Sequence, residues 1–248
     1  MKTNSFTQPT IVSEDTWIAA RKELLREEKE LTRLHDKVAA KRRELPWVKI
    51  DKAYTFDSPA GPVSLAELFN GRSQLAVYHF MLGPDWEEGC KSCSFIADHL
   101  VPTIPHLQAR DVTLAVISRA PIAEILPFQA RMGWSFNWVS SNRNDFNFDY
   151  HVSFSEEEMA RKTVFYNYGL MDFPHEEAPG FSVFAKDAKG NIYHTYSTYG
   201  RGVEQFMGTY TILDLVPKGR DEDPAEPGMD WLRHHDRYDQ SDDVAVAR

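Results

Sequence analysis

The 248 residues are enough for one large domain with appendages, and 42% apolar with 26% charged residues is typical of a globular protein. This composition excludes a fibrous or an intrinsically disordered chain. The net charge of −9 opposes binding to nucleic acid or to an anionic membrane surface, because it repels phosphate. We therefore expect no nucleic-acid partner and no membrane partner.

The first residues show no targeting signal. No apolar run follows Lys2, and no later segment approaches the roughly 20 apolar residues of a membrane-spanning helix. The sequence therefore predicts a cytoplasmic protein. In a reducing cytoplasm, a close pair of cysteines is expected to bind a metal or to cycle between thiol and disulfide, rather than to form a structural disulfide.

A long amphipathic helix is predicted from Ser13 to Glu44, within an N-terminal extension of residues 1–46. The segment contains no glycine or proline. The acidic residues at its start and the basic residues at its end interact favourably with the helix dipole, which stabilises the helix. Four apolar residues recur every seven positions: Trp17, Leu24, Leu31 and Val38. This narrow stripe predicts packing on the rest of the chain, with pairing in a homodimer as the alternative.

A core domain is predicted over residues 47–216. Residues 52–72 are typical of a short strand, a Pro-Gly turn, a second short strand and a small helix. Almost continuous apolar runs, rich in β-branched and aromatic residues, predict strands that are covered on both faces. Three runs have this character: residues 73–82, 111–118 and 134–141.

Helices are predicted between these strands. Residues 95–110 contain Pro102 and Pro105, so we expect a kink or a break into two helices. Residues 120–133 are helical in pattern, with a bend at Pro127. Two strand–helix–strand units with buried strands predict an α/β fold with parallel strands and right-handed crossovers.

The remainder of the chain is less regular. Residues 142–178 are polar, aromatic and weakly periodic, so we interpret them as an insertion or a long loop. A hairpin is predicted over residues 180–197, followed by an amphipathic helix over residues 202–215. The C-terminal tail, residues 217–248, resembles a linker and includes a candidate short helix at residues 229–239.

Both cysteines of the chain lie in the sequence Cys90-Lys91-Ser92-Cys93, where a buried strand meets a helix. A thiolate at a helix N-terminus faces unpaired N–H groups, which lowers its pKa from about 8.5 toward roughly 7 or below. Lys91 also favours the thiolate, whereas nearby acidic residues oppose it. The two-residue spacing lets one sulfur resolve a mixed disulfide at the other, so the motif favours redox chemistry.

From about Lys49 to Leu215 the chain resembles the thioredoxin superfamily. The similarity consists of a buried strand, Trp86 shortly before the cysteine pair, a helix interrupted by proline, and a proline that opens a hairpin. The resemblance implies a thioredoxin-like fold, a central mixed sheet flanked by helices, with no cofactor. It also implies that Cys90 attacks, that Cys93 resolves, and that Pro179 is the cis-proline whose preceding carbonyl pairs with a substrate backbone.

A closer resemblance covers nearly the whole chain. It is carried by the segments "GRSQLAVYHFMLGPDWEEGC", "RDVTLAVISRAP", "GWSFNWVSS", "YHTYSTYGRG" and "PKGRDEDP". These look like a bacterial thioredoxin-like family of unknown physiological role, described as predicted dithiol-disulfide oxidoreductases. The resemblance implies an enzyme that acts on a protein disulfide or a small thiol, with an unknown electron donor or acceptor.

The sequence departs from thioredoxins on the strand before the motif. His79 stands where thioredoxins hold a buried aspartate, so one hypothesis is that neutral His79 relays the proton of Cys93. The alternative is a core histidine whose hydrogen bonds are satisfied internally. We expect Trp86, Trp134 and Trp138 around the active cleft, as supporting residues.

Two other kinds of site are excluded by the residues around the motif. A peroxiredoxin requires a threonine or serine three residues before its reactive cysteine, but Glu87 stands there, and Pro84 is one residue too close. Covalent haem requires histidine directly after the second cysteine, where this chain has Ser94.

Two alternatives remain open. Cys90 and Cys93 could bind zinc or copper with a histidine, such as His99, His151 or His194. A non-catalytic interaction protein on a thioredoxin fold is the other alternative, because fold does not fix function.

Overall fold

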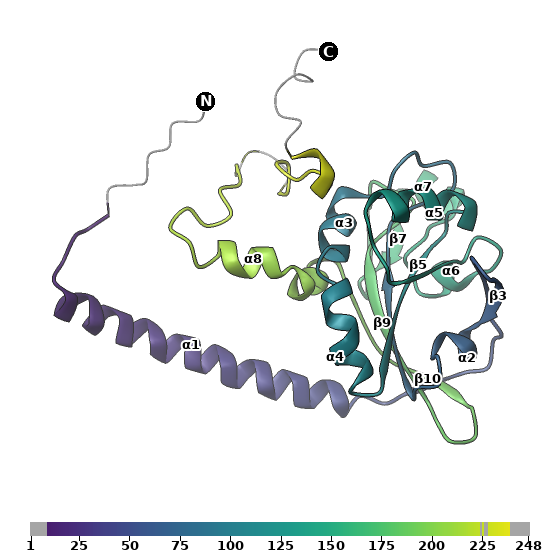
Figure 1. Cartoon of the computed structure of the whole chain (residues 1–248), viewed down its shortest axis with the longest axis horizontal. Helices are drawn as coiled ribbons and strands as arrows, with labels where there is room; N and C mark the ends of the chain where they lie inside the picture. Colours follow the sequence, from purple (N-terminus) through teal and green to yellow (C-terminus); the bar gives the residue numbers. More distant parts are fainter. Residues whose placement is uncertain (1–8, 224, 226–227, 239–248) are drawn as a thin grey trace, which may run out of the picture.

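The computed structural model describes residues 9–223, 225 and 228–238, and a mixed β-sheet organises them (Figure 1). Within this part of the chain the sheet has eight strands. In spatial order they are β1 (Val48–Ile50), β10 (Ile192–Tyr199), β9 (Gly180–Lys186), β4 (Gln74–His79), β5 (Val112–Ser118), β6 (Asn137–Ser140), β2 (Thr55–Ser58) and β3 (Gly61–Ser64).

Helices and a small second sheet complete the described residues. The helices are α1 (Glu14–Arg43), α2 (Leu65–Leu68), α3 (Lys91–Ala97), α4 (Ile104–Gln108), α5 (Ile122–Arg131), α6 (Phe146–Asp149), α7 (Glu156–Ala160) and α8 (Gly208–Leu213). Short 3₁₀ helices are η1 (Val101–Thr103), η2 (Gly200–Phe206) and η3 (His235–Arg237). The second sheet pairs β7 (Val164–Tyr166) with β8 (Gly169–Met171).

Strand β4 lies at the centre of the sheet. It runs parallel to β5, which runs parallel to β6, and it is antiparallel to β9 on its other side. Every residue of β4 except Gln74 is buried, because helices and loops cover both faces. Alternate side chains enter opposite cores: Ala76 and Tyr78 lie in one, and Leu75 and Val77 in the other.

The connectivity defines a thioredoxin-like fold. A β4–α3–β5 unit is followed by the antiparallel pair β9 and β10 and then by η2 and α8. The expected mixed sheet flanked by helices is confirmed. The predicted break at Pro102 and Pro105 is present, since η1 separates α3 from α4, and Pro127 lies inside α5.

Residues 142–178 are more ordered than their sequence pattern suggested. They form α6, α7 and the β7–β8 hairpin, and together with Tyr199 of β10 they enclose a small separate core. That core contains Val152, Phe154, Val164, Tyr166, Ala178 and Tyr199. The elements are three to five residues long, which is too short to produce a recognisable hydrophobic period.

Helix α1 projects from the domain instead of packing on it (Figure 1). Ser13 caps the helix, but the helix has no buried residue, and Leu31 is 68% exposed. The expectation that its apolar stripe packs on the rest of the chain is therefore wrong in this structure. None of the described helices is long and apolar enough to cross a membrane.

Candidate active site at the cysteine turn

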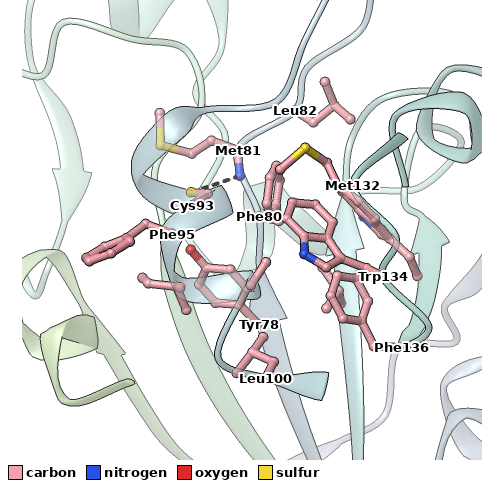
Figure 2. Close-up of a cluster of buried hydrophobic side chains, with 14 of the residues drawn as sticks. Tyr78, Phe80, Met81, Leu82, Cys93, Phe95, Leu100, Met132, Trp134 and Phe136 are labelled. Atoms are coloured by element: carbon pink, nitrogen blue, oxygen red, sulfur yellow. Dashed lines mark hydrogen bonds between the residues drawn. The ribbon is translucent and has the colours of Figure 1, made fainter. Parts of the chain in front are cut away.

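Cys90 and Cys93 lie at the start of α3, just beyond the end of the central strand β4. The backbone N–H of Cys90 donates to the carbonyl of Met81 at 3.1 Å, which fixes the turn against the strand extension. The N–H of Met81 in turn donates to Cys93 Sγ at 3.4 Å (Figure 2). Both residues are free thiols; Cys93 is buried and Cys90 is partly exposed.

The two thiols have opposite acidities. Hydrogen bonds from the Cys93 thiol and from the backbone N–H groups of Cys93 and Ser92 lower the pKa of Cys90 to about 6, although burial opposes them. Burial, followed by the hydrogen bond to Cys90 and its charge, raises the pKa of Cys93 well above the ordinary value. At neutral pH the site therefore holds a Cys90 thiolate and a Cys93 thiol.

Tyr78 on β4 is the side chain that faces Cys93 from the sheet. Its hydroxyl is buried, points toward the turn of α3 (Figure 2) and has no hydrogen-bond partner in place among the described residues. Burial, and then the charge of Cys93, raise the pKa of Tyr78, so the hydroxyl stays protonated and can donate. The nearby hydroxyl lowers the pKa of Cys93 and opposes the effect of burial.

His79 lies on the opposite face of the sheet from the cysteines, as alternation along a strand requires. Its Nε2 shares a hydrogen bond of 2.8 Å with Ser182 Oγ, and its ring stacks on Tyr150 at 5.9 Å between centroids. Burial lowers the pKa of His79 to about 3, so the imidazole is neutral. The structure thus does not bring His79 to Cys93, which contradicts the relay hypothesis. His79 is a core histidine, but only Nε2 has a hydrogen-bond partner, because no described residue bonds the buried Nδ1.

Pro179 directly precedes β9, as the resemblance implied, but its peptide bond is trans, since the described residues contain no cis peptide bond. Its carbonyl accepts the Tyr166 hydroxyl at 2.7 Å. The N–H of the preceding Ala178 donates to the carbonyl of Val152 at 2.8 Å. These two bonds occupy the Ala178 N–H and the Pro179 carbonyl, whereas the group that the resemblance assigned to substrate is the Ala178 carbonyl.

Cys90 opens into a hollow of about 420 Å³. Trp86 and Lys91 line it beside the cysteine, and His175 reaches it from the segment that was interpreted as an insertion. The remaining side comes from the C-terminal segment, which supplies three lining side chains: Arg233, His234 and Arg237.

The C-terminal segment, residues 228–238, is anchored to the cysteine turn by burial and by charge. Leu232 is fully buried, and His234 Nε2 donates to the carbonyl of Gly89 at 2.9 Å. Arg131 on α5 bridges Glu88 and Asp236, with N···O distances of 2.6 and 2.8 Å. The predicted short helix is here the single turn η3, and residues 239–248 lie outside the described part of the chain.

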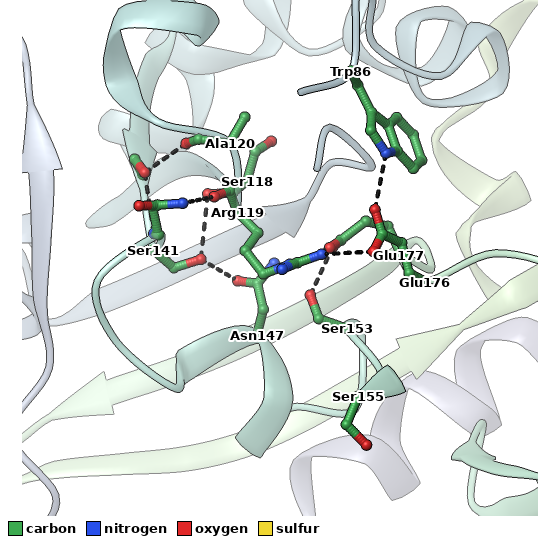
Figure 3. A network of polar contacts seen from close by, with 12 residues as sticks. Trp86, Ser118, Arg119, Ala120, Ser141, Asn147, Ser153, Ser155, Glu176 and Glu177 are labelled. Atoms are coloured by element: carbon green, nitrogen blue, oxygen red, sulfur yellow. Dashed lines mark hydrogen bonds and ion pairs between the residues drawn. The ribbon is translucent and has the colours of Figure 1, made fainter. Parts of the chain in front are cut away.

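Trp86 is held by a polar network that reaches the domain interior (Figure 3). Its Nε1 donates to Glu176 Oε1 at 3.0 Å. Arg119 pairs with both Glu176 and the buried Glu177, whose second oxygen accepts from Ser153 Oγ at 2.6 Å. Trp86 thus borders the cysteine hollow from a fixed position.

The other two tryptophans are not in the cleft. Trp134 and Trp138 are buried in the core around Phe80, and Trp138 Nε1 donates to Ser118 Oγ. The expectation that they surround the cleft is wrong, because both side chains are buried in this core and neither lines the hollow at Cys90.

The histidines considered as metal ligands lie apart from the cysteines. His99 bonds to the Phe95 carbonyl and Thr209, and His194 bonds to Ser197. The ring of His151 contacts Phe165. Among the described residues, no group of three or more His, Cys, Asp or Glu side chains is arranged to hold a metal ion.

A cysteine pair after the central strand of this sheet places the chain in the thioredoxin-like superfamily. Within it, the family described as "Bacterial protein of unknown function (DUF899)" matches residues 6–238, so the chain belongs to that family. This confirms the expected membership in a bacterial family of unknown role. No curated protein matches the sequence.

Solved structures with similar folds are distant in sequence. Peroxidoxin BcpB from Mycobacterium tuberculosis has a TM-score of 0.43 at 11% identity, covering 66% of this chain and 95% of that one. A peroxiredoxin Q variant from Xanthomonas campestris has a TM-score of 0.42 at 9% identity, covering 64% and 90%. A putative thiol:disulfide interchange protein DsbE from Chlorobium tepidum has a TM-score of 0.40 at 12% identity, covering 66% and 97%.

Proposed function

We propose that the protein is a dithiol-disulfide oxidoreductase that exchanges thiols and disulfides through Cys90 and Cys93. The observation that carries this proposal is the split acidity of the pair, with the pKa of Cys90 lowered to about 6 and that of Cys93 raised. The more accessible thiol is thereby ionised, as a nucleophile must be, while its buried partner is held in reserve.

The reaction follows from this geometry. The Cys90 thiolate attacks one sulfur of a substrate disulfide, whose S–S bond breaks and releases one thiolate. Cys93 then loses its proton and attacks Cys90 Sγ, which releases the second thiolate and leaves an intramolecular disulfide. Two electrons pass from the dithiol to the substrate, and the reverse sequence oxidises a substrate dithiol.

The buried Tyr78 hydroxyl, which has no hydrogen-bond partner in place among the described residues, supports the second half of this sequence. Cys93 must lose its proton before it attacks, and burial opposes that loss. A donated hydroxyl stabilises the forming thiolate without taking up its proton, because the pKa of Tyr78 is itself raised. Tyr78 is therefore proposed as a positioning residue for resolution.

The proposal includes a reducing cytoplasm as the place of reaction and needs no cofactor, because the electrons move between sulfur atoms. The physiological partners are a protein disulfide or a small thiol, together with a separate electron donor or acceptor. The chain has just two cysteines, both in the motif, which supports a reducing cytoplasm as the place of reaction.

Equilibration of the purified protein in graded glutathione redox buffers tests the proposal. Alkylation and mass measurement are expected to show both thiols disappearing in one transition, with a midpoint between roughly −270 mV and roughly −120 mV. A Cys93→Ser variant is expected to accumulate a mixed disulfide at Cys90, whereas a Cys90→Ser variant is not. Thiols that stay free throughout, or that are masked until a chelator is added, contradict the proposal.

Hydrogen peroxide provides a control for peroxidase chemistry. Because Glu87 replaces the hydroxyl residue that a peroxiredoxin places near its cysteine, we expect slow oxidation of Cys90 by peroxide and fast exchange with disulfides. Faster reaction with peroxide than with disulfides would instead identify a thiol peroxidase.

A further inference from the structure

Two positive charges border Cys90 without a carboxylate partner. Lys91 and Arg233 both line the hollow. The Arg233 guanidinium donates to the backbone carbonyls of Asp230 and Leu232, at 3.0 Å each, which leaves its charge uncompensated. In the part of the chain that the structure describes, no carboxylate pairs with either cation.

The hollow as a whole is positive, although the chain carries a net charge of −9. Its charged lining consists of three cations, Lys91, Arg233 and Arg237, and two anions, Glu88 and the Cys90 thiolate. Glu88 is already engaged, since Arg131 and Arg237 both donate to its Oε2, at 2.6 and 3.0 Å. An anion that enters the hollow therefore meets free cations and no free carboxylate of the lining.

The surroundings of Cys90 favour a small ligand over an extended polypeptide. The N–H of Ala178 is bonded to the Val152 carbonyl and the carbonyl of Pro179 accepts the Tyr166 hydroxyl, so these two groups are not free for a substrate backbone, although these bonds leave the Ala178 carbonyl unoccupied. The volume of about 420 Å³ falls within the roughly 300–1,000 Å³ of small-molecule sites. The C-terminal segment closes one side of this space.

We propose that the substrate is a low-molecular-weight disulfide whose substituents carry carboxylates, bound by Lys91 and Arg233 with its S–S bond at Cys90. This inference rests on the proposed function and specifies its substrate class. The Cys90 thiolate displaces the first acidic thiolate, which takes a proton from water, and Cys93 displaces the second. The dithiol loses the two electrons that the substrate gains.

Single-turnover oxidation of the reduced, full-length protein tests this inference. Three probes differ in charge: glutathione disulfide is acidic, cystamine is cationic and hydroxyethyl disulfide is neutral. The reaction is stopped with an alkylating agent, and free thiols are counted by mass. Each rate is divided by the rate of the same disulfide with dithiothreitol, which removes differences in intrinsic reactivity.

We expect the normalised rate for glutathione disulfide to exceed those for the other two probes by about tenfold, and to fall as salt is added. Arg233→Glu is expected to lower the ratio of glutathione disulfide to hydroxyethyl disulfide by about tenfold and to raise the ratio for cystamine. Lys91→Glu, on a separate element, should shift both ratios in the same directions. Lys189→Glu is the matched control, because Lys189 is exposed in the β9–β10 turn and its substitution changes the charge of the protein by the same amount.

Equal normalised rates for the three probes, or ratios that Arg233→Glu and Lys91→Glu leave unchanged, would overturn the inference while leaving disulfide exchange intact. Oxidation by insulin but by none of the small probes would overturn it in favour of a polypeptide substrate. If neither the probes nor insulin oxidise the dithiol, the proposed function itself fails. The neutral probe thus separates the two failures.

Discussion

His234 Nε2 donates a hydrogen bond of 2.9 Å to the carbonyl of Gly89, which lies 145 residues earlier in the sequence and directly before Cys90. The contact is buried, since His234 is 5% exposed and Gly89 is buried. It ties the C-terminal segment to the backbone of the cysteine turn, so the shape of the hollow depends on two distant parts of the chain.

Replacement of His234 by leucine tests the strength of this tie. Leucine keeps the apolar contact but leaves the buried Gly89 carbonyl without its donor, which costs about 1–3 kcal/mol. We expect the free energy of unfolding in urea to fall by that amount. His106→Leu, at an exposed histidine of α4, is the control and should have little effect. An unchanged stability for His234→Leu would show that the segment is not held by this bond.

Removal of the Tyr78 hydroxyl is expected to slow resolution. In Tyr78→Phe, Cys93 loses the donor that lowers its pKa, so its thiolate becomes rarer. A rise of about one pKa unit makes decay of a mixed disulfide at Cys90 about tenfold slower. The decay is measured by mass after reaction of the reduced protein with a small disulfide.

Tyr54→Phe is the control for that experiment, because Tyr54 is a buried tyrosine on the other side of the sheet whose hydroxyl donates to Asp149 Oδ2 at 2.8 Å. It should leave the decay unchanged. If the mixed disulfide decays at the same rate in Tyr78→Phe as in the unmodified protein, Tyr78 has no role in the resolution step.

The reactivity of Cys90 should depend on pH in a defined direction. With a pKa of about 6, the thiolate predominates above that pH, so the rate of alkylation at Cys90 is expected to be nearly constant at neutral pH and to fall tenfold per unit well below pH 6. Rates are followed by mass, which distinguishes Cys90 from the protonated Cys93. A midpoint near 8.5, the ordinary value for cysteine, contradicts the activated thiolate.

Substitutions at Cys93 separate the causes of this activation. The hydrogen bond from Cys93 is the largest contribution that lowers the pKa of Cys90. Cys93→Ala removes the donor, and Cys93→Ser keeps one. We therefore expect the pKa of Cys90, followed by the ultraviolet absorbance of the thiolate, to rise more in the alanine variant than in the serine variant. Equal pKa values of Cys90 in the two variants would show that the backbone N–H groups, and not the Cys93 thiol, lower the pKa of Cys90.

Helix α1 is expected to associate with the α1 of a second copy. Its exposed apolar stripe repeats every seven residues, and its first turn is acidic while its last turn is basic. Antiparallel pairing places these opposite charges side by side. The mass in solution, measured by light scattering, should be that of a dimer.

Leu31→Lys inserts a charge into this stripe and should convert the dimer to a monomer. Leu170→Lys is the matched control, since Leu170 is a similarly exposed leucine that lies on β8 and not in the apolar stripe of α1. A protein that is already monomeric before substitution would show that α1 does not pair with itself.

The sequence predicted the parts of the structure that depend on local pattern. Strands β4 and β5 were visible as apolar runs, and the break between α3 and α4 followed from Pro102 and Pro105. The position of Cys90 at the start of α3 followed from the same pattern. These features need no knowledge of tertiary contacts.

Features that depend on long-range packing were not predicted. The residue of β4 that faces Cys93 is an example: the sequence suggested His79, but the structure places Tyr78 there. Both neighbours on β4 are buried, and only the packing on each face of the sheet decides which of them lies against α3. Successive side chains of β4 point to opposite faces of the sheet. One known contact on each face would therefore have been enough to indicate Tyr78. The approach of Arg233 and His234 to Cys90 had no local signal at all.

The closure of the hollow by the C-terminal segment also has a consequence during synthesis. A ribosome completes β4 and both cysteines long before it reaches His234, so the emerging chain holds its thiols for a time without the wall that later encloses them. During that interval Lys91 stands beside Cys90 without the cationic side chain of Arg233, so one of the two proposed binding charges is missing. The full selectivity that we propose is thus acquired late, when the last described turn of the chain docks.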